Sequence, residues 1–376
     1  MCVVNRVQLG DLLDYEQPTR YIISSTDYDD AYDTPVLTAG QPFILGYTNE
    51  TEGIYKASKS NPVIIFDDFV TSFYLVDFNF KVKSSALKIL KPKKNVNIYY
   101  VYYAMLGINF VPKEHARHWI SKYSQFEIAY PSLAKQQEIV SQLDTFTTLI
   151  FNLESELDMR RKQYEHYRNQ LLDFEGVEGV EWKPYAKIGT ITDYVSNGSF
   201  ADLRNNVEYK QAVDYAILVR TVDFSTNFDK SKLVYIDEKA YNFLSKSKLF
   251  GGEIIINNIG AGVGSTFICP QLGQPMSLAP NAIMLNTPNN KFYYYWFVSK
   301  YGQDKMMSIV AKSAMPKFNK TGFKGLEVPI PSSETQQQIV EKLDAFEQLI
   351  QSLETEIKLR KQQYEYYREN LLTFEK

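Results

Sequence analysis

Cysteine is almost absent from the sequence, with two residues, Cys2 and Cys269, among 376. So few thiols exclude a disulfide framework and a cysteine-based zinc site, and they favour a reducing compartment. The sequence also lacks an apolar run of the roughly 20 residues that a bilayer-spanning helix needs. Its first residues do not form a secretory signal pattern. We therefore expect a cytoplasmic protein that does not enter a membrane.

Motifs that carry catalysis are missing as well. The three histidines are too few to indicate a nucleophile–base pair, and neither a Walker loop nor an Asn/Asp-Pro-Pro-aromatic methylation motif occurs. Asp67 and Asp68 lack the downstream acidic-x-Lys partner of a nuclease centre. Gly260, Gly262 and Gly264 follow a predicted strand, but their spacing departs from the dinucleotide fingerprint and another strand follows, which predicts a hairpin turn. The sequence thus predicts a protein that is not itself an enzyme.

Charge is sorted by segment. The net charge of −3 combines an excess of four positive charges in residues 176–330 with acidic excesses of three in each of 131–175 and 331–376. Residues 78–113 hold seven Lys and no acidic residue. Because opposite charges occupy different segments, the overall balance does not argue against nucleic-acid binding.

An internal repeat organises the chain, whose length fits two domains. Residues 131–175 align without a gap on 331–375, with 24 identities in 45 positions. Each copy opens with Pro-Ser and then contains neither Pro nor Gly. Its apolar residues recur at alternating spacings of four and three, which predicts one long helix with a coiled-coil seam. Two unrelated amphipathic core helices are the alternative interpretation.

One seam position carries arginine in both copies, Arg160 and Arg360. Parallel helices in register would place the two guanidinium groups in one layer, where they would repel each other. Antiparallel helices instead bring Arg160 towards Glu354 and Arg360 towards Glu154. We therefore expect an antiparallel intramolecular coiled coil.

The segments ahead of the two helices share a weaker outline, in which strands lead into a Tyr-rich helix and then into a closing strand. We expect an α/β (α+β) fold with two globular mixed domains, residues 1–130 and 176–330, separated by the long helices 131–175 and 331–376. The Tyr-rich segments 99–103 and 293–296 are interpreted as core and not as platforms for stacked bases. The matching strands are expected at 62–66 and 253–256, 87–90 and 282–285, and 126–128 and 326–328.

This organisation resembles the specificity subunits of type I restriction–modification systems. The resemblance rests on a Gln-Gln-x-Ile-Val-x-x-Leu-Asp motif at 136–144 and again at 336–344, each following a Pro-Ser boundary. Each long helix also closes on Tyr-Glu-x-Tyr-Arg-x-x-Leu-Leu-x-Phe. The resemblance covers essentially the whole chain, and its helical motif is more specific than the motifs of the domains.

The resemblance implies a DNA-specificity role. Each domain would be a target-recognition domain that reads one half of a bipartite site in double-stranded DNA, and the helices would set the spacer and dock two modification subunits. Restriction subunits would join the complex. No cofactor is expected on this chain, because S-adenosylmethionine, ATP and Mg²⁺ belong to the partner subunits. The rival interpretations are a coiled-coil interaction scaffold with two ligand-binding domains and, with less support, an unrecognised enzyme.

Candidate DNA contacts are basic, acid-poor segments, because lysine neutralises phosphates and arginine offers a bidentate fork to guanine. Solvated turns or structural loops are the alternative for each of them. His115 and His118 have a metal-like spacing, but no third ligand is evident and no metal is expected. The candidates are Lys81, Lys83, Ser84, Ser85, Lys88, Lys91, His115, Arg117 and His118 in the first domain, and Arg204, Lys312, Ser313, Lys317, Asn319 and Lys320 in the second.

The resemblance also implies that the repeated helices carry the subunit interface. The residues expected there recur in both copies of the repeat. They are Gln136, Gln137, Asp144, Tyr164 and Arg168, with Gln336, Gln337, Asp344, Tyr364 and Arg368.

Overall fold

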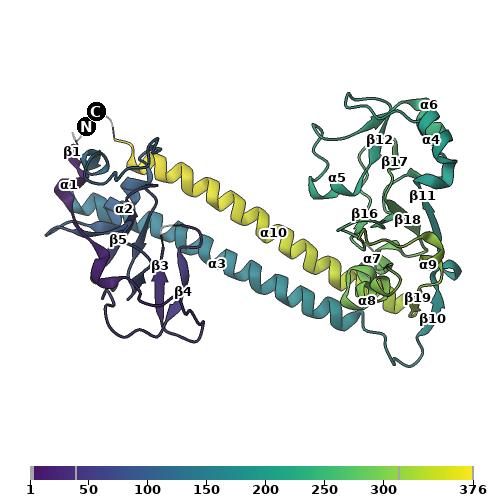
Figure 1. Cartoon of the computed structure of the whole chain (residues 1–376), viewed down its shortest axis with the longest axis horizontal. Helices are drawn as coiled ribbons and strands as arrows, with labels where there is room; N and C mark the ends of the chain where they lie inside the picture. Colours follow the sequence, from purple (N-terminus) through teal and green to yellow (C-terminus); the bar gives the residue numbers. More distant parts are fainter. Residues whose placement is uncertain (1–3, 39, 312–313, 375–376) are drawn as a thin grey trace. The chain divides into compact units, whose positions relative to one another are not determined.

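The computed structural model describes residues 4–38, 40–311 and 314–374. Its contacts divide the chain into two compact units, Met1–Ser155 with Glu354–Lys376, and Glu156–Leu353. Each unit contains one mixed domain together with parts of the two long helices, α3 (Leu133–Leu171) and α10 (Ser333–Leu372) (Figure 1). Among the described residues, no helix combines the length and the apolar character needed to cross a membrane.

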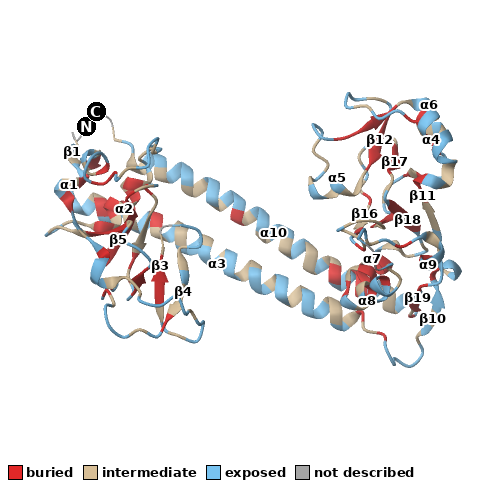
Figure 2. Ribbon diagram, in the orientation of Figure 1, coloured by how far each residue is buried: buried red, intermediate tan, exposed pale blue. Residues whose placement is uncertain are grey.

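The first domain is built on an antiparallel four-stranded sheet in the order β2-β8-β5-β6 and a three-stranded sheet in the order β4-β3-β7. The central strand β5 is buried at every position (Figure 2), as expected for a Val/Ile-rich run that is covered on both faces. The strands are β1 (Asn5–Gln8), β2 (Leu13–Glu16), β3 (Thr34–Leu37), β4 (Ile44–Thr48), β5 (Val63–Asp67), β6 (Phe73–Val76), β7 (Lys81–Val82), β8 (Leu87–Pro92) and β9 (Glu127–Tyr130). The helices are α1 (Leu9–Leu12), η1 (Pro18–Tyr21), α2 (Ile98–Leu106) and η2 (Tyr123–Gln125).

The second domain repeats this plan with additions. Its four-stranded sheets have the orders β11-β18-β15-β16 and β13-β12-β17-β14. The strands are β10 (Glu181–Pro184), β11 (Thr190–Asp193), β12 (Ala216–Val219), β13 (Tyr235–Ile236), β14 (Lys248–Leu249), β15 (Ile254–Asn257), β16 (Thr266–Ile268), β17 (Met276–Leu278), β18 (Ala282–Asn286) and β19 (Glu327–Ile330). The helices are η3 (Tyr185–Lys187), η4 (Tyr194–Asn197), α4 (Phe200–Asn206), α5 (Thr221–Ser225), α6 (Glu238–Phe243), α7 (Asn290–Val298), α8 (Lys300–Ser308) and α9 (Lys320–Lys324).

The two domains correspond strand by strand, as their shared sequence outline predicts. The order β2-β8-β5-β6 matches β11-β18-β15-β16, and the parallel pair β3/β7 matches the parallel pair β12/β17. The glycine-rich segment around Gly260 and Gly264 joins the antiparallel strands β15 and β16, so the predicted hairpin is confirmed. A strand follows these glycines and not a helix, which removes the helix N-terminus that a dinucleotide pyrophosphate needs.

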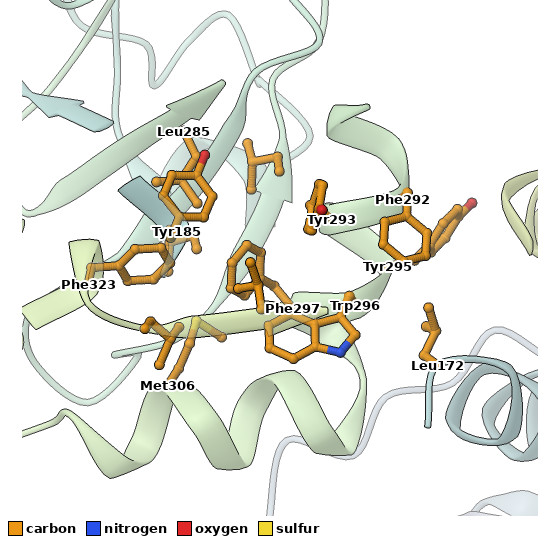
Figure 3. Packing of buried hydrophobic residues seen from close by; sticks show 14 of the residues in the cluster. Leu172, Tyr185, Leu285, Phe292, Tyr293, Tyr295, Trp296, Phe297, Met306 and Phe323 are labelled. Carbon is orange, nitrogen blue, oxygen red and sulfur yellow. The ribbon is translucent and has the colours of Figure 1, made fainter. Parts of the chain in front are cut away.

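The Tyr-rich helices belong to the cores, as expected. Tyr100 and Tyr103 of α2 are buried, as are Tyr295 and Trp296 of α7. Figure 3 shows α7 contributing Phe292, Tyr295, Trp296 and Phe297 to one cluster with residues that include Leu172. Truncating a buried aromatic of this size to alanine costs about 3–5 kcal/mol.

The long helices pack together in opposite directions. In the first unit, Phe146 of α3 stacks on Tyr367 of α10 with 5.2 Å between ring centroids. In the second unit, the Tyr164 hydroxyl of α3 donates to Glu347 of α10 at 2.9 Å. The beginning of each helix therefore lies against the end of the other, and the predicted antiparallel pairing is confirmed.

Arg160 and Arg360 of the seam both pair with carboxylates, but each carboxylate lies on the same helix as its arginine. Arg160 donates to Glu156 at 3.3 Å, and Arg360 donates to Glu356 at 2.8 Å. The sequence predicted partners across the seam. A glutamate four residues before an arginine lies on the same helix face, and both arginine side chains keep more than a third of their surface exposed. Solvent and the intrahelical pair together stabilise these charges.

Candidate nucleic-acid interface

Asp68 forms hydrogen bonds with both segments of the first domain that carry candidate DNA contacts. It follows strand β5 and is completely buried. Its amide donates to the Ala86 carbonyl at 3.0 Å and its carbonyl accepts from the His118 amide at 2.8 Å. Its side chain accepts from the Trp119 amide at 2.8 Å. The turn at 83–86 and the loop at 113–118, which are separate in sequence, are thereby brought together.

A buried ion pair underlies this junction. Lys88 Nζ lies 3.1 Å from Asp68 Oδ2, and the two side chains are 2% and 0% exposed. Arg117, half exposed, reaches the same oxygen at 3.8 Å. Its guanidinium also lies over the Phe69 ring, on which His115 stacks at 4.8 Å. The Asp68 carboxylate therefore connects an interior cation with an exposed one.

The exposed candidates form the outer part of this junction. Lys83, Ser84, Ser85, His115 and Arg117 are all exposed. Their side chains offer an ammonium, two hydroxyls, an imidazole and a guanidinium. These groups suit phosphate oxygens and the edges of bases.

Several other candidates of the first domain are engaged inside it. Lys81 is buried, pairs with Glu50 at 2.8 Å and donates to the Glu52 carbonyl at 2.7 Å. The hydrogen bond from Lys81 lowers the pKa of Glu50 below its ordinary value. Lys91 pairs with Glu16 at 2.8 Å. His118, like Lys88, is buried. These four side chains are held by groups of their own domain.

Asn258 occupies the corresponding junction of the second domain. It follows strand β15 as Asp68 follows β5. Its amide donates to the Asn281 carbonyl at 3.2 Å, and its carbonyl accepts from the Phe318 amide at 3.1 Å. The backbone connections of the first domain are thus reproduced, with a neutral side chain in place of a carboxylate.

The candidates of the second domain lie partly around this junction. Lys317 is exposed, in a segment that forms isolated bridges with Ile259 and Ala311. Asn319 caps helix α9 by accepting from the Gly322 amide at 2.8 Å. Lys320 donates to Asp193 at 2.8 Å and to Ser196 at 2.6 Å. Arg204 is exposed on α4. Lys312 and Ser313 lie outside the described residues.

A small pocket adjoins the junction of the second domain. Its volume is about 190 Å³, and Asn258, Asn281 and Lys317 are among the residues that line it. The Asn258 Oδ1 atom is buried and has no hydrogen-bond partner within the described part of the chain. Asn258 thus lines the pocket while its Oδ1 atom remains a buried acceptor.

The motif at the start of each long helix holds that helix to its domain. Gln136 Nε2 donates to the Pro131 carbonyl at 2.8 Å, and Gln336 Nε2 donates to that of Pro331 at 3.0 Å. The motif aspartates accept from the Tyr-rich helices: Tyr103 donates to Asp144 and Tyr295 to Asp344, each at 2.6 Å. Burial, and then the bond to the aspartate, raise the pKa of both tyrosines. These motif residues have structural roles within the chain.

The remaining predicted interface residues lie along the helix pair. Gln137 and Gln337 are exposed, whereas Tyr164 and Tyr364 are half-buried. Arg168 lies over the Tyr164 ring at 5.4 Å and Arg368 over the Tyr364 ring at 5.7 Å. The two copies of the repeat thus build the same arginine–tyrosine contact.

Residues central to both junctions were missed by sequence reasoning. Asp68 was considered only as a nuclease ligand, and Asn258 was not singled out. The available signal was position, since each directly follows the buried central strand of its sheet. Within the described residues, no cluster of three or more His, Cys, Asp or Glu side chains is placed to hold a metal ion.

Known proteins resemble this chain in both sequence and fold. The family model described as the type I restriction modification DNA specificity domain matches residues 4–158 and 180–360. The chain is 38% identical to the EcoR124I/EcoR124II type I restriction enzyme specificity subunit of Escherichia coli, over 99% of this chain and 95% of that protein.

Solved structures agree in fold. An S subunit of a type I restriction–modification system from M. genitalium superposes with a TM-score of 0.60 at 15% identity, covering 99% of this chain and 97% of that one. A chain from a study of complex assembly and conformational transition of the type I R-M system gives a TM-score of 0.54 at 13% identity, covering 99% and 98% of the two chains.

Proposed function

We propose a function from one premise: the chain belongs to the specificity subunits of type I restriction–modification systems. Members of this family are the non-catalytic DNA-recognition components of complexes with modification and restriction subunits. We propose that each domain of this chain reads one half of a bipartite DNA site. The antiparallel helices would set the distance between the halves and dock two modification subunits.

One observation carries the proposal. Both domains build the same junction after the central strand, where a turn and a loop meet on the backbone of Asp68 or Asn258. The backbone of the two junctions is alike and the side chains around them differ. Two equivalent scaffolds with unlike side chains suit the reading of two unlike half-sites.

The proposed DNA contacts are chosen from the candidate residues whose side chains are exposed to solvent. In the first domain we assign them to Lys83, Ser84, Ser85, His115 and Arg117, and we leave out the internally engaged Lys81, Lys88, Lys91 and His118. In the second domain we assign them to the exposed Arg204, Lys317 and Asn319. Lys312 and Ser313, outside the described residues, stay candidates because of the basic sequence around them. Lys320 is better suited to holding the loop, because it donates to Asp193 and Ser196.

Catalysis and cofactors would reside in the partners. The methyltransferase chemistry, with S-adenosylmethionine, is assigned to the modification subunits. The ATP- and Mg²⁺-dependent endonuclease chemistry is assigned to the restriction subunits. The contribution of this chain would be binding, since phosphate contacts position a protein on DNA and base contacts specify the sequence.

Selection from random duplex DNA tests the proposal. The full chain, assembled with modification subunits, should enrich a motif of two short fixed blocks separated by unread bases. Replacing residues 1–130 with those of another family member should change one block, and replacing residues 176–330 should change the other. Enrichment of no split motif would favour the interaction-scaffold alternative. A change of both blocks in either exchange would contradict modular reading.

A further inference from the structure

Each long helix is held to its domain by a motif aspartate, Asp144 in α3 and Asp344 in α10. The two aspartates differ in what their second carboxylate oxygen contacts. Asp344 uses Oδ1 to accept from Tyr295 and Oδ2 to accept from Lys291 Nζ at 2.7 Å. Asp144 uses Oδ1 in the same way, for Tyr103. The residue four places before Tyr103, which corresponds to Lys291, is Tyr99. Its hydroxyl donates to the Lys59 carbonyl at 3.3 Å.

Asp144 therefore faces a pocket and not a lysine. This pocket, of about 610 Å³, lies where α3 meets the residues that begin α2, and Asn97, Tyr99, Gln137 and Ser141 are among those that line it. Asp144 is its sole charged lining residue, and within the described residues it forms no ion pair. A carboxylate with one committed oxygen presents the other to a cation.

A second contact is also missing at this end of the repeat. In the second domain, Asn289 Nδ2 donates to Gln336 Oε1 at 3.2 Å. In the first domain, Gln136 Oε1 is buried and has no partner among the described residues, although Asn97 holds the position of Asn289. Two contacts that complete the second copy, one from the Lys291 ammonium and one from the Asn289 amide, are thus absent from the described part of the first copy.

We propose that a lysine or arginine side chain of a modification subunit enters this pocket and pairs with Asp144, taking the place that Lys291 occupies at Asp344. The inference rests on the proposed function, because it needs a modification subunit docked on α3. The second copy of the repeat supplies the template, since the equivalent carboxylate already holds a cation at hydrogen-bond distance.

The consequence is an unequal pair of docking sites. Two identical modification subunits present the same cation to both ends of the repeat. At Asp144 that cation meets a carboxylate, whereas at Asp344 it meets the positive charge of Lys291. Like charges brought together at an interface disfavour association. The first modification subunit should therefore bind at the Asp144 end.

Exchanging the two positions tests this. In Tyr99→Lys, an internal ammonium should pair with Asp144 and weaken the binding of one modification subunit by roughly tenfold, while the chain's melting temperature stays unchanged or rises. Lys291→Tyr should tighten the weaker of the two sites. Asp144→Asn, which keeps an oxygen for Tyr103, should weaken the stronger site. Stepwise binding of purified modification subunit to the full chain, followed by native mass spectrometry, measures both sites.

The outcomes separate the two proposals. An unaltered chain that binds no modification subunit would end the proposed function and this inference with it. An unaltered chain that binds two, together with Tyr99→Lys and Asp144→Asn variants that fold and bind both as tightly, would overturn this inference alone. Opposite shifts in Tyr99→Lys and Lys291→Tyr would support it, because simple damage to the fold weakens binding in both.

Discussion

The two domains satisfy the same interior positions with different chemistry. In the first, Asp68 and Lys88 form a buried ion pair. The strand registers place Ile283 at the position of Lys88, since Lys88 pairs with Phe66 and Ile283 with Ile256. Asn258 stands at the position of Asp68. A charged pair in one domain is therefore a neutral pair in the other.

A second interior position is also charged in the first domain and neutral in the second. Lys81 pairs with Glu50 in the first domain. The corresponding strand position in the second domain carries Ser277, which is fully buried and forms a hydroxyl contact with Ser247 at 3.1 Å. Duplication has kept the backbone connections of the two domains. The internal side chains have changed in matched sets, because a lone buried charge is costly.

The largest expected effect comes from breaking the ion pair of the first domain. Asp68→Asn alone should lower the free energy of unfolding by about 3–5 kcal/mol, because it leaves the buried Lys88 ammonium uncompensated. Lys88→Ile should cost less, because Arg117 still lies 3.8 Å from Asp68 Oδ2. The double variant copies the second domain and should recover most of that loss. Denaturant unfolding of the four chains gives the coupling energy. Losses that simply add in the double variant would show that the positions are not coupled.

An intermediate effect is expected at the exposed cations that differ between the domains. Arg117→Ala should cost about 1–3 kcal/mol of DNA binding and relax selectivity at one position of one half-site, as for a guanidinium that reads a base. Lys317→Ala should weaken binding to all sequences alike and reduce the salt slope by about one. Binding to a panel of single-base variants at several salt concentrations measures both. Equal losses on every sequence for Arg117→Ala would indicate a phosphate contact.

The smallest effect is the pH-dependent part of the stability that the Lys81–Glu50 pair supplies. Because Lys81 lowers the pKa of Glu50 in the folded chain, the stabilisation is complete above the ordinary glutamate pKa of about 4.5. It is lost as the pH falls through the lowered folded value. Glu50→Gln should therefore lower stability near neutral pH and flatten its decline below about pH 4.5.

Glu181→Gln provides the matched control for that measurement. Glu181 pairs with Lys183 on the surface of the second domain, and solvent screens such a pair. The control should leave the pH profile of unfolding nearly unchanged. Profiles of Glu50→Gln and Glu181→Gln that coincide would assign no special role to the buried pair.

The sequence predicted the elements that depend on periodicity and duplication. The two long helices, the hairpin at Gly260 and the burial of the Tyr-rich helices were all expected, because local pattern determines them. The antiparallel direction was also predicted correctly, although the partners predicted for Arg160 and Arg360 across the seam were wrong. The charged interior was not expected. Lys81 and Lys88 lie in an acid-free run, but Glu50 and Asp68 lie just after the strands β4 and β5, and only tertiary structure brings them within reach of the lysines.

The candidate site was predictable only in outline. The exposed Arg117 and Lys317 follow from basic loops, whereas the junction that supports each loop depends on backbone hydrogen bonds over long sequence separations. Arg160 shows a different limit. Near the middle of the helix pair, Arg160 is partly exposed and pairs with a glutamate of its own helix. A prediction from the heptad pattern assumes that the seam excludes water, so it places the partner on the other helix.

The strands that open and close each domain have a further consequence. Strand β1 pairs with β9, and β10 pairs with β19, so the chain enters and leaves each domain along one ribbon immediately before a long helix. Segments between those ribbons that do not contact the long helix can be lengthened, shortened or exchanged without redirecting it, whereas α2 and α7 must keep their contacts with Asp144 and Asp344. Under the proposed function, exchange of the segments between the ribbons would give a domain a new DNA target while the long helices stay the same.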